Sequence, residues 1–314
     1  MRLFLIVLIM SLMSSLSYAR EQINIVGSST VYPFSTVVAE RFGKSGKFQT
    51  PVIESTGTGG GMKLFCAGIG TNTPDMSNAS RKIKAKEIAL CKKNNVTDIT
   101  QVIVGLDGIA FTSSVKGKEY NFTKKHLWEA MSDLGSKPKK WSDIDPSLPD
   151  YKIAILTPPA TSGTRDAWNS LVMKKGCPEE ILKEQGKKAC YMLREDGAVI
   201  EVGENDTLII NKLVGEPTYF GIFGFSYYDN SKDKVQAHLI EDKKISLKSI
   251  QDGSYPISRP LYFYVKDQHI GVIPGVEEYV KEFTSKRAAG PRGYLLDLGL
   301  VPLKSLKESI SKVN

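Results

Sequence analysis

The chain has 314 residues, with 42 Lys and Arg against 34 Asp and Glu, four Cys and three His. This length is sufficient for a large hydrophobic core in one or two domains. The basic excess suits the capture of anions, but no run of Lys and Arg stands out and aromatic side chains are not interleaved with basic ones, so the composition argues against nucleic-acid binding.

The first 19 residues have the pattern of a secretory signal peptide. Arg2 precedes the apolar run from Leu3 to Met10, and small residues lead to Ser17-Tyr18-Ala19, after which we expect cleavage. An uncleaved anchor is the alternative, but the apolar run is short for a membrane span. No Cys follows the run, so a lipid anchor is not expected, and no later segment could cross a bilayer. We therefore expect an exported, periplasmic protein.

The four cysteines fall into two local pairs, Cys66 with Cys91 and Cys177 with Cys190. An exported chain favours disulfides, and of the three possible connectivities we expect this local one. Zinc binding is the alternative. The spacings lack a Cys-x-x-Cys, however, and the only histidines are His126, His238 and His269.

The first part of the mature chain alternates strands, polar turns and helices. The apolar pattern predicts strands over 23–26 and 48–54 and helices over 32–42, 62–67 and 85–93. Turns rich in Ser, Thr or Gly occupy 27–30, 56–61 and 75–81, and in them Ser29-Thr30, Thr58 and Ser80-Arg81 could each supply hydroxyl or N–H donors to a single phosphate-binding cleft. A long extended stretch, 100–113, follows, and we expect it to break at Leu106-Asp107-Gly108. Such alternation indicates parallel sheets covered on both faces, in which ligands gather at the carboxyl ends of strands.

A further strand-to-helix turn contains Ser162-Gly163-Thr164-Arg165-Asp166, between an apolar run over 151–156 and a predicted helix over 167–173. The first turn of a helix has unpaired N–H groups and partial positive charge, and Arg165 would add a planar fork of donors. This turn therefore suits an oxyanion such as phosphate. The alternative is an ordinary helix start, in which Ser162 or Thr164 is the cap and Arg165 is solvated.

The remaining chain predicts a second lobe and a return to the first. Helices are expected over 204–214, 246–251 and 276–286, and a loop with a short helix over 293–303. The run 255–266, rich in Tyr and Pro, is expected to be a strand that crosses back near a hinge.

Two other functions fit the motifs poorly. The Gly-rich turn 57–63 has neither the P-loop spacing nor a clean Gly-x-Gly-x-x-Gly with a suitable acid downstream, which argues against a nucleotide site. Ser162 could be the nucleophile of an exported hydrolase, but Gly-x-Ser-x-Gly is absent and each of the three histidines lies in a surface or structural context. We therefore expect no enzymatic activity and no cofactor.

Six motifs, in this order along the chain, resemble the phosphate-binding proteins of bacterial phosphate ABC importers, within the type II periplasmic binding proteins. These motifs are Gly27-Ser28-Ser29-Thr30-Val31-Tyr32-Pro33, Gly61-Met62-Lys63, Ala79-Ser80-Arg81, Leu106-Asp107-Gly108-Ile109-Ala110, Ser162-Gly163-Thr164-Arg165-Asp166 and Tyr255-Pro256-Ile257-Ser258-Arg259-Pro260-Leu261-Tyr262.

The resemblance implies an α/β fold of two lobes joined by a two-strand hinge, with the ligand cleft between them. Lobe 1 would comprise residues 20–105 and 265–314, and lobe 2 residues 106–264. The phosphate-binding residues that the resemblance implies are Ser29, Thr30, the Val31 N–H and Thr58 from lobe 1, and Ser162, Gly163 and Thr164 from lobe 2.

The chain departs from the best-known family pattern at its charged positions. Some members have an Asp where this chain has Ser80-Arg81, and an Arg a few residues before Ser-Gly-Thr, where this chain has Pro158-Pro159. Arg81 or Arg165 would replace the missing Arg, and Asp107 is the expected acceptor of the phosphate proton. Asp75 and Asp166 are the alternatives, and Asp166 could instead orient Arg165.

The sequence thus predicts an exported, monomeric solute-binding protein that captures inorganic phosphate and delivers it to a membrane permease of a phosphate ABC importer. A binding protein for sulfate or molybdate is the alternative within the same class.

Overall fold

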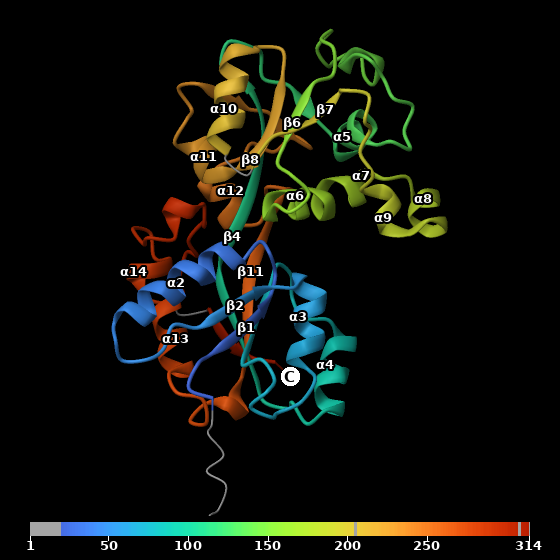
Figure 1. The fold of residues 1–314 in the computed structure, drawn as a ribbon. Coiled ribbons are helices and arrows are strands. Elements are labelled where there is room, and N and C mark those ends of the chain that lie inside the picture. The colour runs from blue at the N-terminus through green and yellow to red at the C-terminus, as the bar shows by residue number, and fades with distance from the viewer. Residues whose placement is uncertain (1–19, 204–205, 307–308, 314) are drawn as a thin grey trace, which may run out of the picture.

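The computed structural model describes residues 20–203, 206–306 and 309–313, which fold into two lobes (Figure 1). The predicted signal peptide lies outside the described residues. Within them, no helix combines the length and the apolar character needed to span a membrane.

Lobe 1 is built on three parallel strands, in which β1 (Asn24–Gly27) lies between β2 (Val52–Ser55) and β3 (Met76–Ala79). The helices that cover this sheet, and the C-terminal elements that complete the lobe, are α2 (Tyr32–Lys44), α3 (Gly57–Phe65), α4 (Ala85–Lys93), η3 (Asp267–His269), α13 (Val276–Phe283), α14 (Lys286–Ala289), η4 (Leu296–Leu298) and β12 (Ile310–Lys312). In α2, Phe34, Val38 and Phe42 recur every four residues and are buried on one face.

The hinge consists of two long antiparallel strands, β4 (Ile99–Ser114) and β11 (Ser258–Lys266), which run from one lobe into the other (Figure 1). The predicted break at Leu106-Asp107-Gly108 is absent. Instead, β4 exchanges partners: residues 99–108 pair with β11, and residues 109–113 pair with β8 (Phe220–Gly224). Because a backbone partner is available on both sides of residue 108, the strand continues through the glycine.

Lobe 2 contains parallel β6 (Ile155–Thr157), β7 (Val199–Glu201) and β8, with β9 (Val235–Ala237) on β4 and a small sheet of β5 (Asn121–Phe122) and β10 (Leu239–Ile240). Its helices are α5 (Lys124–Met131), η1 (Trp141–Asp143), α6 (Gly163–Trp168), the π-helical η2 (Asn169–Met173), α7 (Lys174–Gly176), α8 (Glu179–Glu184), α9 (Gly186–Cys190), α10 (Asp206–Gly215), α11 (Phe225–Asp229) and α12 (Leu247–Gln251). The first two residues of the helix predicted over 204–214 lie outside the described residues.

Each lobe has its own hydrophobic core. One cluster in lobe 2 contains Phe111, Trp141 and Trp168, all fully buried. Two clusters lie in lobe 1, and one of them includes Leu261 and Phe263 from the hinge strand β11, which the predicted boundary at residue 264 assigns to lobe 2. The mixed sheet, with strand order β2-β1-β3-β11-β4-β8-β6-β7, therefore runs through both lobes.

Both predicted disulfides are confirmed: Cys66–Cys91 lies in lobe 1 and Cys177–Cys190 in lobe 2. One local prediction is wrong, because the Gly-rich residues 57–61 form the first turns of α3 rather than a turn before it. At Gly61 an added Cβ would lie 2.5 Å from the Gly27 Cα. Glycine has a low helix propensity, but its lack of a side chain lets α3 pack directly against β1.

Candidate functional site

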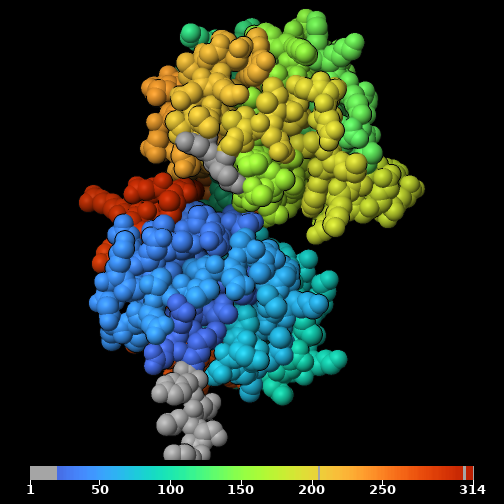
Figure 2. All heavy atoms as spheres, in the orientation of Figure 1, coloured from blue at the N-terminus to red at the C-terminus, as the bar shows by residue number. Residues whose placement is uncertain are grey.

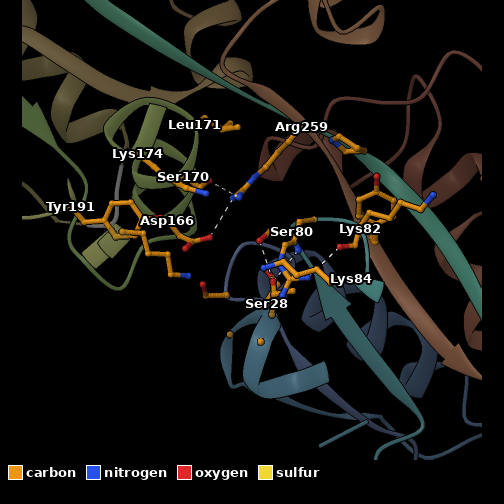
Figure 3. A pocket seen from close by; sticks show the side chains of 18 residues that line it. Ser28, Ser80, Lys82, Lys84, Asp166, Ser170, Leu171, Lys174, Tyr191 and Arg259 are labelled. Carbon is orange, nitrogen blue, oxygen red and sulfur yellow. Dashed lines mark hydrogen bonds and ion pairs between the residues drawn. The ribbon is translucent and has the colours of Figure 1, made fainter. Parts of the chain in front are cut away.

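A cavity of about 550 Å³ lies between the lobes beside the hinge, where the surface is notched in the space-filling view (Figure 2). Its wall comes from both lobes and from β11 (Figure 3). The lining residues are Ser28, Ser29, Gly57, Thr58, Gly59, Ser80, Arg81, Lys82, Lys84, Asp166, Ser170, Leu171, Lys174, Lys187, Tyr191, Arg259, Pro260 and Tyr262.

Lobe 1 contributes hydroxyl groups from three turns. Ser28 and Ser29 follow β1, Thr58 is in the first turn of α3 after β2, and Ser80 follows β3. The carboxyl ends of these parallel strands meet at one edge of the sheet, which is why turns far apart in sequence converge. The Thr58 and Ser80 hydroxyl oxygens are 3.2 Å apart, and the Ser80 N–H donates to Thr58 Oγ1 at 3.1 Å. Hydroxyls and the amino end of α3 together form a wall of donors suited to an anion.

Lobe 2 faces this wall with one continuous helical segment, α6–η2–α7. Asp166, Ser170 and Lys174 project from it toward the cavity, spaced four residues apart and therefore on one helix face (Figure 3). Tyr191, which follows α9, completes this side. Burial, with a smaller effect of Asp166, raises the pKa of the Tyr191 hydroxyl.

Arg259 on β11 connects all of these parts. Its Nη2 donates to Thr30 Oγ1 of lobe 1 at 3.0 Å, and its Nη1 donates to Ser170 Oγ of lobe 2 at 3.3 Å. The same guanidinium lies 3.6 Å from an Asp166 oxygen and 3.5 Å from Asp107 Oδ2. Only 10% of its side chain is exposed. A planar cation at the hinge, in reach of both lobes, is well placed to bind an oxyanion bidentately.

Asp107 lies beside Arg259 on the neighbouring hinge strand. Burial raises the pKa of the Asp107 carboxyl above its usual range, and the charge of Arg259 acts in the opposite direction. Asp107 Oδ2 is buried and has no hydrogen-bond partner among the described residues, so its only partner there is the Arg259 ion pair.

The predicted anion-binding turn Ser162-Gly163-Thr164 lines an adjacent cavity of about 510 Å³, together with Ser29, Thr30 and Asp107. In this turn the Ser162 hydroxyl oxygen caps α6 by accepting a hydrogen bond from the Thr164 N–H. The lobes touch here, because Thr30 Oγ1 donates to the Gly163 carbonyl at 3.3 Å. At Gly163 a Cβ would lie 2.6 Å from the Thr30 Cα, so the close approach requires glycine.

The structure thus distributes the predicted site residues over two adjacent cavities. Those in the larger cavity are Ser29, Thr58, Ser80 and Arg81, and those in the second are Ser29, Thr30, Asp107, Ser162, Gly163 and Thr164. Val31 is fully buried at the start of α2, and its side chain lines neither cavity. Arg81 forms a bidentate ion pair with Glu87, at 2.8 and 2.9 Å.

Two predicted charged residues lie away from both cavities. The Arg165 side chain is buried under lobe 2, where Nη1 donates to the Pro158 carbonyl at 3.0 Å and pairs with Glu201 at 3.2 Å. It lines neither cavity, so the expected role of Arg165 is not supported by its position. Asp75, one alternative acceptor, pairs with Arg20 and His269 at the base of lobe 1.

Arg259, Ser28 and Ser170 line the larger cavity but are absent from the predicted site. Arg259 belongs to one of the six motifs that resemble the family, but the run 255–266 predicts only a hinge strand. The signal for Arg259 is its position: it precedes the apolar and aromatic run from Leu261 to Val265 on the same strand, and a charged residue needs a partner when it is buried. No group of three or more His, Cys, Asp or Glu side chains able to hold a metal occurs among the described residues.

Comparison with known proteins gives a consistent picture. The family model described as "PBP superfamily domain" matches residues 15–287. Protein SphX of Synechococcus elongatus is 30% identical over 249 residues, which cover 77% of this chain and 67% of that protein. Phosphate-binding protein PstS of Staphylococcus saprophyticus is 28% identical and covers 92% of this chain and 83% of that protein.

Two solved structures share the fold. A possible phosphate-binding protein from Planctomyces limnophilus aligns with a TM-score of 0.74 at 27% identity, covering 91% of this chain and 95% of that one. An ABC-type phosphate transport receptor from Vibrio cholerae aligns with a TM-score of 0.64 at 18% identity, covering 89% of this chain and 99% of that one, which shows similarity of fold alone.

Proposed function

The chain belongs to the PBP superfamily, and from this premise we propose that it is an exported solute-binding protein that captures inorganic phosphate between its lobes and delivers it to an ABC-type permease. The relatives named phosphate-binding protein and the neighbouring phosphate transport receptor support this assignment. The observation that carries it is Arg259, a largely buried cation that contacts both lobes beside a wall of hydroxyl donors.

In this proposal the phosphate lies in the larger cavity between the hydroxyls of lobe 1 and the guanidinium of Arg259. Ser29, Thr58 and Ser80 donate or accept as the hydroxyl hydrogens rotate, and Arg259 supplies charge-assisted donors. Ser170 adds a hydroxyl from lobe 2. Because donors come from both lobes, binding would favour the conformation in which the lobes are together.

Asp166 is the acceptor that we assign to the phosphate proton. Its carboxylate lines the larger cavity and lies 3.6 Å from the Arg259 guanidinium. Phosphate keeps at least one proton near neutral pH and can donate to this carboxylate, whereas sulfate has only acceptors and would face it as a like charge. Asp107 would instead hold the Arg259 Nε from the side of the hinge. This acid favours phosphate over sulfate or molybdate as the ligand.

We assign the protein a non-catalytic role, release by cleavage after Ala19, a monomeric state and a membrane permease as partner. The relatives named as binding proteins support the non-catalytic role, and the two disulfides suit export.

Calorimetric titration of the mature, ligand-free protein with phosphate and with sulfate tests the assignment. We expect one phosphate per chain, with sulfate much weaker at the same pH and ionic strength. Equal affinities for the two anions, or no heat with phosphate, would contradict it.

A further inference from the structure

The larger cavity has room for more than one phosphate ion. Its volume of about 550 Å³ is in the range of sites that hold small organic ligands. This volume does not reflect widely separated lobes, because Thr30 already donates to Gly163 across the cleft and Arg259 bonds to both lobes. The hydroxyls and Arg259 occupy one part of the wall, which leaves the rest for a longer ligand.

Four lysines line the remainder of the wall, and we call them the cavity lysines: Lys82, Lys84, Lys174 and Lys187. Lys82 and Lys84 belong to lobe 1, beside Ser80, and Lys174 lies on the facing wall with Asp166 and Ser170 (Figure 3). Lys187 is on α9 of lobe 2.

The cavity lysines differ from the two arginines of the same cavity in their partners. Arg81 is neutralised by Glu87, and Arg259 lies near two carboxylates. None of the cavity lysines forms an ion pair with an acid in the part of the chain that the structure describes, where the cavity contains one acid, Asp166. The wall therefore carries an excess of positive charge for which the protein supplies no counter-charge there.

These positive charges also face one another across the cleft. The pKa of Lys84 is lowered, first by the charge of Arg81 in the same lobe and then by burial, while Glu87 acts in the opposite direction; Lys187 of the other lobe adds a smaller lowering. Repulsion between these like charges on the two lobes opposes the approach of the lobes. A ligand that places negative charge between them would relieve this repulsion.

We propose that the cavity lysines form a second anion subsite, which takes the distal phosphoryl groups of a condensed phosphate such as pyrophosphate or tripolyphosphate. This inference rests on the proposed function, because the proximal phosphoryl group occupies the phosphate site at Arg259, Thr58 and Ser80. A phosphoanhydride chain carries negative charge on every phosphoryl group and so matches lysines spread along a wall. A phosphate monoester carries its charge at one end only and would leave these lysines without a counter-charge.

The test is calorimetric titration of the mature, ligand-free protein at ~0.15 M salt, which limits long-range attraction, with a chelator present. The probes are orthophosphate, pyrophosphate, tripolyphosphate and, as a non-phosphate polyanion, citrate. The variant Lys84→Gln/Lys187→Gln is compared with Lys86→Gln/Lys188→Gln, which changes exposed lysines in the same two segments that do not line the cavity. Thermal melts check that both variants fold.

We expect tripolyphosphate to compete with orthophosphate and to bind the wild type with a one-to-one ratio. Lys84→Gln/Lys187→Gln should weaken tripolyphosphate at least about tenfold and leave orthophosphate within about threefold, while the control pair changes neither. If the wild type bound tripolyphosphate through these lysines but did not bind orthophosphate, the proposed function would be overturned and the subsite supported.

Three results would overturn the subsite. Orthophosphate could bind while tripolyphosphate fails to compete at ~1 mM. The lysine variant could weaken both phosphates equally, which is the behaviour of charges that only attract anions to the cleft. Citrate could bind as tightly as tripolyphosphate, which would mean that the wall does not distinguish phosphoryl groups. Each of these leaves capture of orthophosphate intact.

Discussion

Arg259 and Asp107 lie opposite each other on the two hinge strands, as Cα partners in the β11–β4 ladder with Nε 3.5 Å from Oδ2. The cation proposed to bind the ligand is thus held on the element about which the lobes would move. Its other nitrogens extend to Thr30 in lobe 1 and Ser170 in lobe 2. The ion pair stays with the hinge, whereas the contacts to the lobes depend on their relative position.

Arg259→Met should lower phosphate affinity by about 10- to 150-fold, because a hydrogen bond to a charged group contributes about 1.5–3 kcal/mol. Arg165→Ala is the comparison. It should reduce stability, since it removes buried contacts to Pro158 and Glu201, and leave the phosphate dissociation constant within about threefold. Calorimetry and urea unfolding measure the two quantities. If Arg165→Ala weakened phosphate binding and Arg259→Met did not, Arg165 would be the arginine that binds phosphate, which is one of the two arginines that the sequence suggests.

Asp166→Asn should remove much of the preference for phosphate over sulfate, lowering the affinity ratio at least about tenfold. Its side chain is 55% exposed, so the fold should persist. Asp107→Asn should instead weaken both anions to a similar extent, because it releases the Arg259 Nε. Competition titrations with the two anions measure the ratio in each variant. A ratio that changes only in Asp107→Asn would identify Asp107 as the acceptor, as the sequence-based prediction has it.

Gly163→Ala should weaken phosphate binding by keeping the lobes apart, because the new Cβ would meet the Thr30 Cα at 2.6 Å. We expect a larger radius of gyration in the presence of phosphate than for the wild type, measured by small-angle X-ray scattering. Gly215→Ala, where an added Cβ meets nothing within 4 Å, is the control and should behave as the wild type. Unchanged affinity and radius in Gly163→Ala would show that contact between Thr30 and Gly163 is not needed.

Lys266 should make stability rise with pH in the alkaline range. It is fully buried, and burial lowers its pKa from 10.5 to about 8. Between these values the unfolded chain binds more protons than the folded one, so unfolding becomes less favourable as pH rises. Relative to Lys266→Met, the wild type should gain up to about 1.4 kcal/mol per pH unit in this window.

Urea unfolding of both proteins at several pH values measures this gain. The exposed Lys183→Met is the control and should parallel the wild type at every pH. Parallel curves for Lys266→Met would mean that Lys266 has the same proton affinity in both states.

The sequence by itself determined most of the order of elements and which polar segments follow the strands of lobe 1. The helix predicted over 85–93 is α4, with the same bounds, and the polar segments that contain Ser29, Thr58 and Ser80 converge on one cavity, although the segment of Thr58 begins α3 instead of forming a turn. Both follow from local rules: apolar spacing selects helix or strand, and parallel strands bring their carboxyl ends to one edge. The disulfide pairing was also predictable, because short separations make local pairs easy to close.

Only the tertiary structure decided which charged groups face the ligand cavity. Arg165 follows the predicted anion turn directly, yet its guanidinium turns under lobe 2 to Glu201, which is 36 residues away along the chain. Arg259 reaches the cavity from a strand that the sequence marks only as extended. The physical reason is that the direction of a long side chain depends on the partners that other segments bring to it, and for these two arginines those partners are distant in sequence.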